Sequence, residues 1–111
     1  AMLAAMSGPL KTRLVRRATI ADGVVDFFFD VVEPRPFAWK GGQFVTLSVG
    51  TDEKGGQIRR WYSIATAHGD GEHLRLVIKL IPGGVASTYF AGLEPGAEVA
   101  MTGPHGFFTL D

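Results

Sequence analysis

Residues 10–32 read LKTRLVRRATI-ADG-VVDFFFDVV, two runs rich in β-branched and aromatic residues on either side of Ala21-Asp22-Gly23. An Asp-Gly pair between two such runs is a strong signal for a tight hairpin turn. The stretch therefore predicts two antiparallel strands, at Leu10–Ile20 and Val24–Val32, joined by a short turn.

The same pattern of short apolar runs between glycine and proline turns continues along the chain. His73–Ile81 alternates and places Leu74, Leu76, Ile78 and Leu80 on one face, as a half-buried strand does. Because closing a sheet removes its exposed edges, this all-β pattern favours a small antiparallel barrel. The remaining expected elements are strands at Gln43–Val49, Ile58–Thr66 and Val99–Thr102, a helix at Ser87–Leu93, and a turn at Gly103-Pro104-His105-Gly106.

Composition narrows the classes of function. The 111 residues carry no net charge and no cysteine. The missing cysteines exclude disulfides, thiolate metal sites and iron–sulfur clusters, and the zero net charge gives no long-range attraction to nucleic acid. No apolar stretch is long enough to span a membrane. We expect a cytoplasmic protein of one domain over residues 10–111, preceded by a vector-derived remnant or flexible N-terminus over residues 1–9.

Arg60-Trp61-Tyr62-Ser63 places a cation, a hydroxyl-tipped aromatic ring and a small hydroxyl within one strand. Alternation puts Arg60 and Tyr62 on one face, and Trp61 and Ser63 on the other. A flat anionic ligand such as a nucleotide or flavin fits this motif, although one ligand reaches Ser63 only if the strand twists or the ligand wraps its edge. The alternative is a solvated arginine beside ordinary strand aromatics.

Residues 79–88, KLIPGGVAST, form a second candidate element. A strand ends there, two glycines turn the chain, and a helix is expected to begin near Ser87. Glycine lets backbone approach a ligand, and the free amides of a helix start suit a phosphate group. The alternative is that Ser87 or Thr88 only caps the helix.

The other polar residues give weaker signals. His68, His73 and His105 lack metal-ligand spacing and are expected at the surface, so no metal site is predicted. Asp26 and Asp30 are expected as solvated strand residues rather than paired catalytic acids.

Four segments, in order, resemble the FAD-binding domain of the ferredoxin–NADP reductase superfamily, and the resemblance covers residues 10–111. They are Gly42-Gln43-Phe44-Val45, with Gly41 in place of the usual proline, Arg60-Trp61-Tyr62-Ser63, Val77-Ile78-Lys79 through Gly84-Val85-Ala86-Ser87, and Gly103-Pro104-His105-Gly106-Phe107-Phe108. Within this superfamily the chain looks closer to oxygenase and ferredoxin reductases than to flavohaemoglobins.

The resemblance implies a six-stranded antiparallel Greek-key β-barrel with one short capping helix. It also implies that Arg60 pairs with the pyrophosphate of FAD, Tyr62 stacks on the flavin ring, and Ser63 lies near flavin N5. Tyr62 and Ser63 are thus the catalytic candidates. The implied cofactor-binding residues are Arg60, Trp61, Tyr62, Ser63, Val77, Ile78, Lys79, Gly84, Val85, Ala86 and Ser87.

By the same resemblance, the chain is the flavin domain of an NAD(P)H-dependent oxidoreductase, with FAD preferred over FMN. Electrons would pass from nicotinamide hydride through the flavin to an acceptor such as an iron–sulfur protein. The sequence ends where the superfamily's nucleotide domain would begin. The implied partners are therefore an NAD(P)H-binding domain, on a C-terminal part or another chain, and an electron-acceptor protein. The isolated chain is expected to lack NAD(P)H activity.

Two other classes of function remain open from the residues alone. A non-enzymatic barrel that docks a partner or a small ligand would stay colourless with flavin. An oligonucleotide-binding barrel also uses strand aromatics for stacking, but the zero net charge argues against it.

Overall fold

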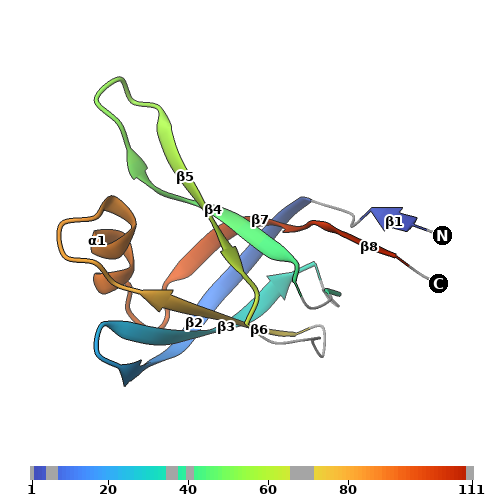
Figure 1. The fold of residues 1–111 in the computed structure, drawn as a ribbon, viewed down its shortest axis with the longest axis horizontal. Helices are drawn as coiled ribbons and strands as arrows, with labels where there is room; N and C mark the ends of the chain where they lie inside the picture. The colour runs from blue at the N-terminus through green and yellow to red at the C-terminus, as the bar shows by residue number, and fades with distance from the viewer. Residues whose placement is uncertain (1, 5–7, 35–37, 40–41, 66–71, 110–111) are drawn as a thin grey trace.

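The computed structural model describes residues 2–4, 8–34, 38–39, 42–65 and 72–109. One antiparallel sheet has the strand order β5-β4-β7-β2-β3-β6, and a separate strand pair, β1-β8, holds the two ends of the chain together (Figure 1). The sheet strands are β2 (Gly8–Ala21), β3 (Val24–Glu33), β4 (Phe44–Thr51), β5 (Gln57–Ser63), β6 (His73–Lys79) and β7 (Glu98–His105), and the pair is β1 (Met2–Ala4) with β8 (Phe107–Thr109).

The predicted hairpin is confirmed between β2 and β3. Ala21 lies opposite Val24, and Gly23 takes a φ of 71°, which a side chain would disfavour. Farther along β2, the register shifts between Leu14 and Arg16. This irregularity brings Arg17 opposite Phe27 and sets the direction of the arginine side chain.

The core follows from alternation along the strands. On β3, Phe27 and Phe29 point inward and are almost fully buried, and on β6 Leu74 and Leu76 do the same. The alternation predicted for residues 73–81 is therefore confirmed. Burying one aromatic ring stabilises a fold by roughly 1.5–3 kcal/mol, so these inward rows hold the sheet in its curved shape.

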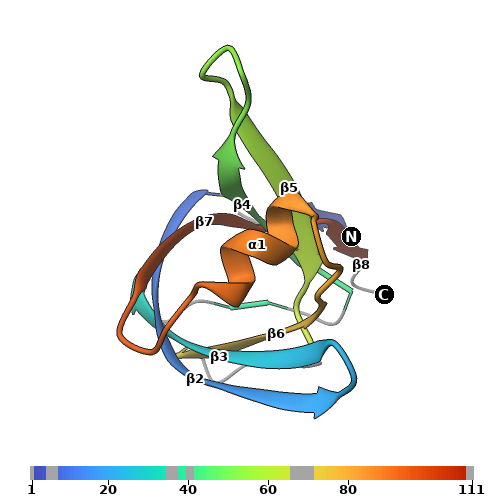
Figure 2. The same ribbon diagram turned by 90° about the vertical axis from the view of Figure 1, so that its left-hand side faces the viewer.

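The sheet curls until its first and last strands approach each other. The Ala65 N–H donates to the Arg75 carbonyl at 2.9 Å, joining the end of β5 to β6, although the two strands are not neighbours in the hydrogen-bonded order of the described residues. The helix α1 (Val85–Ala91) lies across one end of the barrel (Figure 2). The prediction of six antiparallel strands forming a barrel with one short helix is confirmed.

Several predicted boundaries were wrong. Helix α1 begins at Val85, two residues before the expected start at Ser87. Gly84 is its N-cap residue, and no side chain caps the helix. β7 continues through Gly103 and His105, where a turn was expected. Gly103 is buried so closely that a Cβ there would lie 3.0 Å from Val45 Cγ1, so this glycine serves close packing instead of a turn.

Other strand boundaries also differ. Residues 2–4 pair with β8, and β2 begins at Gly8, before the expected start at Leu10. β5 ends at Ser63, and Thr66, the predicted end, lies outside the described residues, as does His68.

Asp26 is not the solvated residue that its position in the sequence suggested. Its side chain is 5% exposed and accepts bonds from Arg75 Nε at 3.0 Å and Arg75 Nη2 at 2.7 Å. The Asp26 hydrogen bond is the main reason why the pKa of Arg75 is raised above its ordinary value. The pair joins β3 to β6 on the outer face of the sheet.

No helix within the described parts of the chain is both long and apolar enough to cross a membrane.

Candidate functional site

A cavity of about 370 Å³ lies between β5, β6 and the turn that leads into α1. We call it the β5–β6 cavity. It brings together all of the predicted cofactor-binding residues except Trp61 and Ser63. Ile81 also lines the cavity, although it was not predicted to bind the cofactor. Its lining consists of Arg60, Tyr62, Val77, Ile78, Lys79, Ile81, Gly84, Val85, Ala86 and Ser87.

Arg60 and Tyr62 enter the cavity from the same face of β5, as the predicted alternation requires. The Tyr62 ring packs edge-on against Phe90 of α1, with ring centroids 5.2 Å apart and an interplanar angle of 88°. Arg60 is exposed, and its Nη1 donates to the Arg59 carbonyl at 2.9 Å. The cavity wall therefore carries a ring braced from behind and a guanidinium beside it.

Trp61 and Ser63 lie on the opposite face of β5. Trp61 is 64% exposed, and its ring centroid is 5.2 Å from that of Phe44 on β4. Phe44 in turn contacts the ring of His105 at 5.2 Å, so three aromatic residues cross the outer side of the sheet. The structure thus does not bring Trp61 or Ser63 into the lining of the β5–β6 cavity.

The turn into α1 is held by two hydroxyl groups. Ser87 Oγ accepts the Ile81 N–H at 2.6 Å, and Thr88 Oγ1 donates to the Gly84 carbonyl at 2.9 Å. The alternative in which Ser87 or Thr88 caps the helix does not hold, because the N-cap residue is Gly84. Because the Ser87 oxygen accepts from Ile81, its own proton is left to donate, and Ser87 lines the cavity.

The electrostatics of the cavity favour an anion. Among the described lining residues the charged side chains are Arg60 and Lys79, both cationic. Most of the other lining residues are aliphatic, and Tyr62 adds an aromatic ring. A flat, partly apolar ligand with phosphate groups suits this combination, because the ring system contacts apolar surface while the cations and the Ser87 hydroxyl hold the phosphates.

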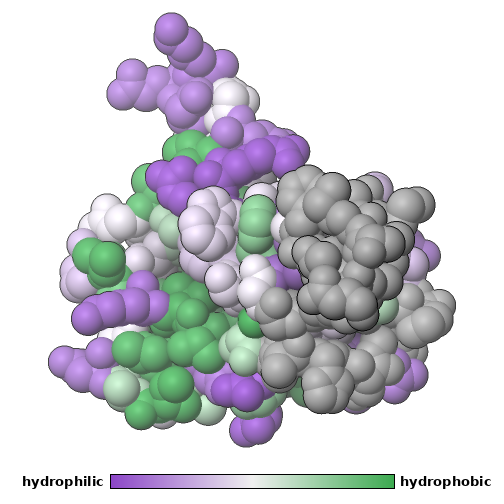
Figure 3. Space-filling model, turned by 45° about the vertical axis from the view of Figure 1, so that its right-hand side comes forward, coloured by the Kyte–Doolittle hydropathy of each residue, from purple (hydrophilic) through white to green (hydrophobic). Residues whose placement is uncertain are grey.

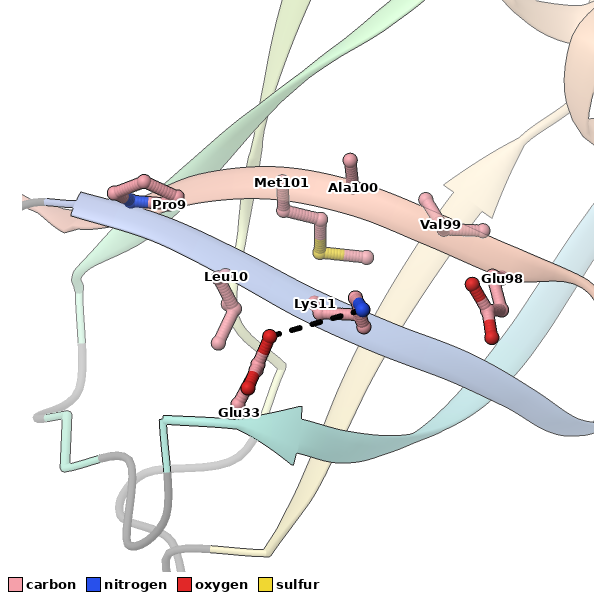
Figure 4. Close-up of a pocket in the computed structure, with 8 residues that line it drawn as sticks. All are labelled: Pro9, Leu10, Lys11, Glu33, Glu98, Val99, Ala100 and Met101. Atoms are coloured by element: carbon pink, nitrogen blue, oxygen red, sulfur yellow. Dashed lines mark ion pairs between the residues drawn. The ribbon is translucent and has the colours of Figure 1, made fainter.

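A second cavity, of about 380 Å³, lies between β2, β7 and the end of β3 (Figure 4). Its charged lining residues are Lys11, Glu33 and Glu98, and Lys11 Nζ already lies 3.7 Å from Glu33 Oε1. With an excess of carboxylate, this cavity is unsuited to a phosphate ligand.

The β4–β5 hairpin extends away from the barrel, and its hydrophilic tip stands clear of the body (Figure 3). Asp52 shapes the tip by accepting the N–H groups of Lys54 at 2.9 Å and Gly56 at 2.8 Å. Within the described residues, no group of three or more histidine, cysteine, aspartate or glutamate side chains is placed to hold a metal ion.

Two residues that support the site were not predicted from the sequence. Phe90 is fully buried behind Tyr62, and Arg17 donates to three carbonyls at the end of α1. The apolar character of Phe90 gave a local signal for burial. Arg17 gave none, since its partners are more than 70 residues away in the chain.

The phenol groups provide a test of this geometry. Burial raises the pKa of Tyr62 and outweighs the opposing charge of Arg60, and burial also raises the pKa of Tyr89. These are the chain's only two tyrosines. Ultraviolet titration should therefore give a phenolate midpoint above the ordinary value of about 10 in the folded protein. Because the pKa of each buried phenol is raised in the folded protein, its contribution to the free energy of unfolding is complete at pH values below the unfolded-state pKa. This contribution is lost as the pH rises through the folded-state pKa.

In the Tyr89→Phe variant the phenolate signal comes from Tyr62 alone. A folded variant that titrates like free tyrosine would contradict the half-buried position of Tyr62.

Comparison with known proteins gives a consistent result. The model of the family described as "Oxidoreductase FAD-binding domain" matches residues 11–110. The chain is 35% identical over 103 residues to ferredoxin–NADP reductase B of Sorangium cellulosum, covering 93% of this chain and 41% of the relative. A crystal structure of an Amycolatopsis cytochrome P450 reductase matches with a TM-score of 0.79 and 32% identity, over 98% of this chain and 32% of that one.

A flavohaemoglobin from Malassezia yamatoensis, solved with bound FAD and haem, matches with a TM-score of 0.72 and 26% identity, over 88% of this chain and 25% of that one. The chain thus spans about two fifths of the Sorangium relative and about a third of the Amycolatopsis reductase.

Proposed function

Because the chain belongs to the oxidoreductase FAD-binding domain family, we propose that it binds FAD in the β5–β6 cavity. The single observation that carries this proposal is the lining of that cavity. Two cations, a braced tyrosine ring and a glycine turn, which are far apart in the sequence, meet around one space of about 370 Å³.

Each residue of the cavity receives a role. Arg60 and Lys79 neutralise the diphosphate, and the Ser87 hydroxyl and the first amides of α1 donate to its oxygens. Tyr62 stacks on the flavin ring, and Phe90 fixes the position of the tyrosine. Backbone groups of Val77–Lys79 and Gly84–Ser87 hold the remainder, with Val85 and Ala86 in apolar contact.

Ser63 and Trp61 are assigned by resemblance to the superfamily. Ser63 follows Tyr62 at the end of β5. We propose that it donates a hydrogen bond near flavin N5 when the ligand reaches around the strand edge. Trp61 contacts the ligand from the same side. Tyr62 and Ser63 are accordingly the proposed catalytic residues.

Bound FAD supplies hydride acceptance and electron transfer. The chain itself supplies placement, charge neutralisation and partial exclusion of water. As part of the same proposal, residues 10–111 form the flavin domain of an NAD(P)H-dependent reductase, whose nucleotide domain lies on a C-terminal part or another chain. The acceptor is an iron–sulfur protein such as a ferredoxin, in line with the name of the matched ferredoxin–NADP reductase. A cytoplasmic location belongs to the same proposal.

The direct test is the visible spectrum of the purified chain mixed with FAD and then freed of unbound ligand. Retained flavin absorbance, with quenched flavin fluorescence from the Tyr62 contact, supports the proposal. A chain that remains colourless at high FAD concentration would refute it and favour the docking module. A parallel titration with FMN compares the two cofactors.

Arg60→Ala is expected to weaken FAD binding by about 10- to 100-fold, because a charge-assisted hydrogen bond contributes roughly 1.5–3 kcal/mol. The dissociation constant is measured from flavin fluorescence quenching at low salt. Arg59→Ala is the matched control, since Arg59 is exposed and outside the cavity lining. Equal affinities of the two variants would count against a phosphate contact by Arg60.

A further inference from the structure

Arg17 holds the C-terminal end of α1. Its Nη1 donates to the carbonyls of Phe90 at 3.0 Å, Ala91 at 3.2 Å and Leu93 at 2.8 Å. Within α1, which the structure describes completely, the last turn carries no basic residue of its own. The guanidinium therefore supplies from β2 the positive charge that the negative end of the helix dipole favours.

The position of Arg17 depends on the core beneath it. The register shift on β2 sets Arg17 opposite Phe27, and its guanidinium carbon lies 5.1 Å from the centroid of that ring. Phe27 is fully buried and also contacts Phe90, at 5.2 Å between centroids. The arginine is thus held by a fixed aromatic surface while it donates to the helix.

The same helix forms part of the β5–β6 cavity. Its first turn, from Val85 to Ser87, lines the cavity, and Phe90 braces Tyr62. α1 has only seven residues, and so short a helix is marginal without tertiary support. A displacement of its C-terminal end would therefore shift the turn at Gly84 and change the orientation of the Tyr62 ring.

We propose that Arg17 is a positioning residue for the cofactor site. It acts through α1 without touching the ligand, setting the place of the first-turn amides and the orientation of Tyr62. This inference rests on the proposed function, since it assumes that the β5–β6 cavity binds FAD. The competing view is that Arg17 contributes to global stability and leaves the site unchanged in the folded protein.

The experiment compares Arg17→Met, which keeps an apolar stem over Phe27, with Arg17→Lys and with the control Arg16→Met. Arg16 is the adjacent arginine, but it is exposed, and its guanidinium carbon lies 4.0 Å from the centroid of the Phe28 ring. All variants are measured as the full 111-residue chain. The readouts are the FAD dissociation constant and the visible circular dichroism of FAD bound at saturation, and far-ultraviolet circular dichroism verifies folding.

We expect Arg17→Met to weaken FAD binding about tenfold and Arg17→Lys about threefold, because the charge-assisted hydrogen bonds to the end of α1 are removed or weakened. Arg16→Met leaves these bonds intact and should bind FAD within about twofold of the original chain. The circular dichroism of bound FAD should differ from that of the original chain more in Arg17→Met than in Arg17→Lys. Global stability alone would not change this signal in a folded, saturated protein.

The inference is overturned if folded Arg17→Met matches Arg16→Met in both affinity and bound-flavin signal. Should Arg17→Met fail to fold, Arg17→Lys decides in the same way, and an unchanged affinity and signal overturn the inference. Failure of the original chain to bind FAD refutes the proposed function instead, so the two failures are distinct.

Discussion

Phe90→Ala is expected to lower the free energy of unfolding by about 3–5 kcal/mol, the largest effect among the substitutions considered. Phe90 is 0% exposed and packs against Phe27 and Tyr62, with ring centroids 5.2 Å away in each case. The small alanine side chain leaves a cavity at the point where α1 meets the barrel. Urea unfolding followed by tryptophan fluorescence measures the loss.

Val85→Ala is the control for Phe90→Ala within the same helix. Val85 is 45% exposed, so its truncation to alanine should change the free energy of unfolding by less than about 0.5 kcal/mol. Phe90→Ala should also weaken FAD binding, because Tyr62 loses its support. A loss of stability below about 1 kcal/mol for Phe90→Ala would contradict the packing described here.

Asp26→Ala is expected to lower the free energy of unfolding by about 2–3 kcal/mol, since it removes a bidentate charge-assisted interaction and leaves Arg75 without its partner. The Asp26 carboxylate is 5% exposed, whereas the Arg75 side chain is 38% exposed. Arg75 can therefore regain some water, which keeps the expected loss below that for a fully buried pair.

A matched pair on the same strands serves as the control. His73 Nε2 lies 3.4 Å from Asp30 Oδ1, with side chains 63% and 39% exposed. Asp30→Ala should cost less than about 1 kcal/mol, because even with His73 protonated this is an exposed ion pair. The double variant Asp26→Ala with Arg75→Met should recover part of the loss, because no unpaired charge remains beside β3. Equal losses for Asp26→Ala and Asp30→Ala would argue against a structural role for the pair.

Local signals explain which parts of the fold were predictable. The Asp22-Gly23 turn and the alternation along β6 depend on neighbouring residues, and both predictions are confirmed. The end of β7 was mispredicted because Gly103 was read as a turn signal. Its role is close packing against Val45 on β4, a partner that adjacent residues do not reveal.

In the candidate site, too, features set by neighbouring residues were predictable, and features set by distant residues were not. Alternation on β5 separates Arg60 and Tyr62 from Trp61 and Ser63, and only the first two line the cavity, although all four were expected to bind the cofactor. The helix start was misjudged because serine is a common N-cap, whereas Ser87 bonds to the turn before the helix. The burial of Asp26 depends on Arg75, 49 residues away, and a single carboxylate in a strand gives no sign of such a partner.

The approach of the first and last strands of the sheet has a thermodynamic consequence. β5 and β6 stand at opposite ends of the strand order, and each supplies one wall of the β5–β6 cavity. A ligand that contacts both walls binds only while these two edges are together. It therefore raises the free energy of unfolding of the barrel, and the increase grows with the logarithm of the free ligand concentration. Cofactor release and separation of the edges are then coupled. Bound flavin would thus link β5 to β6 and stabilise the closed form of the barrel.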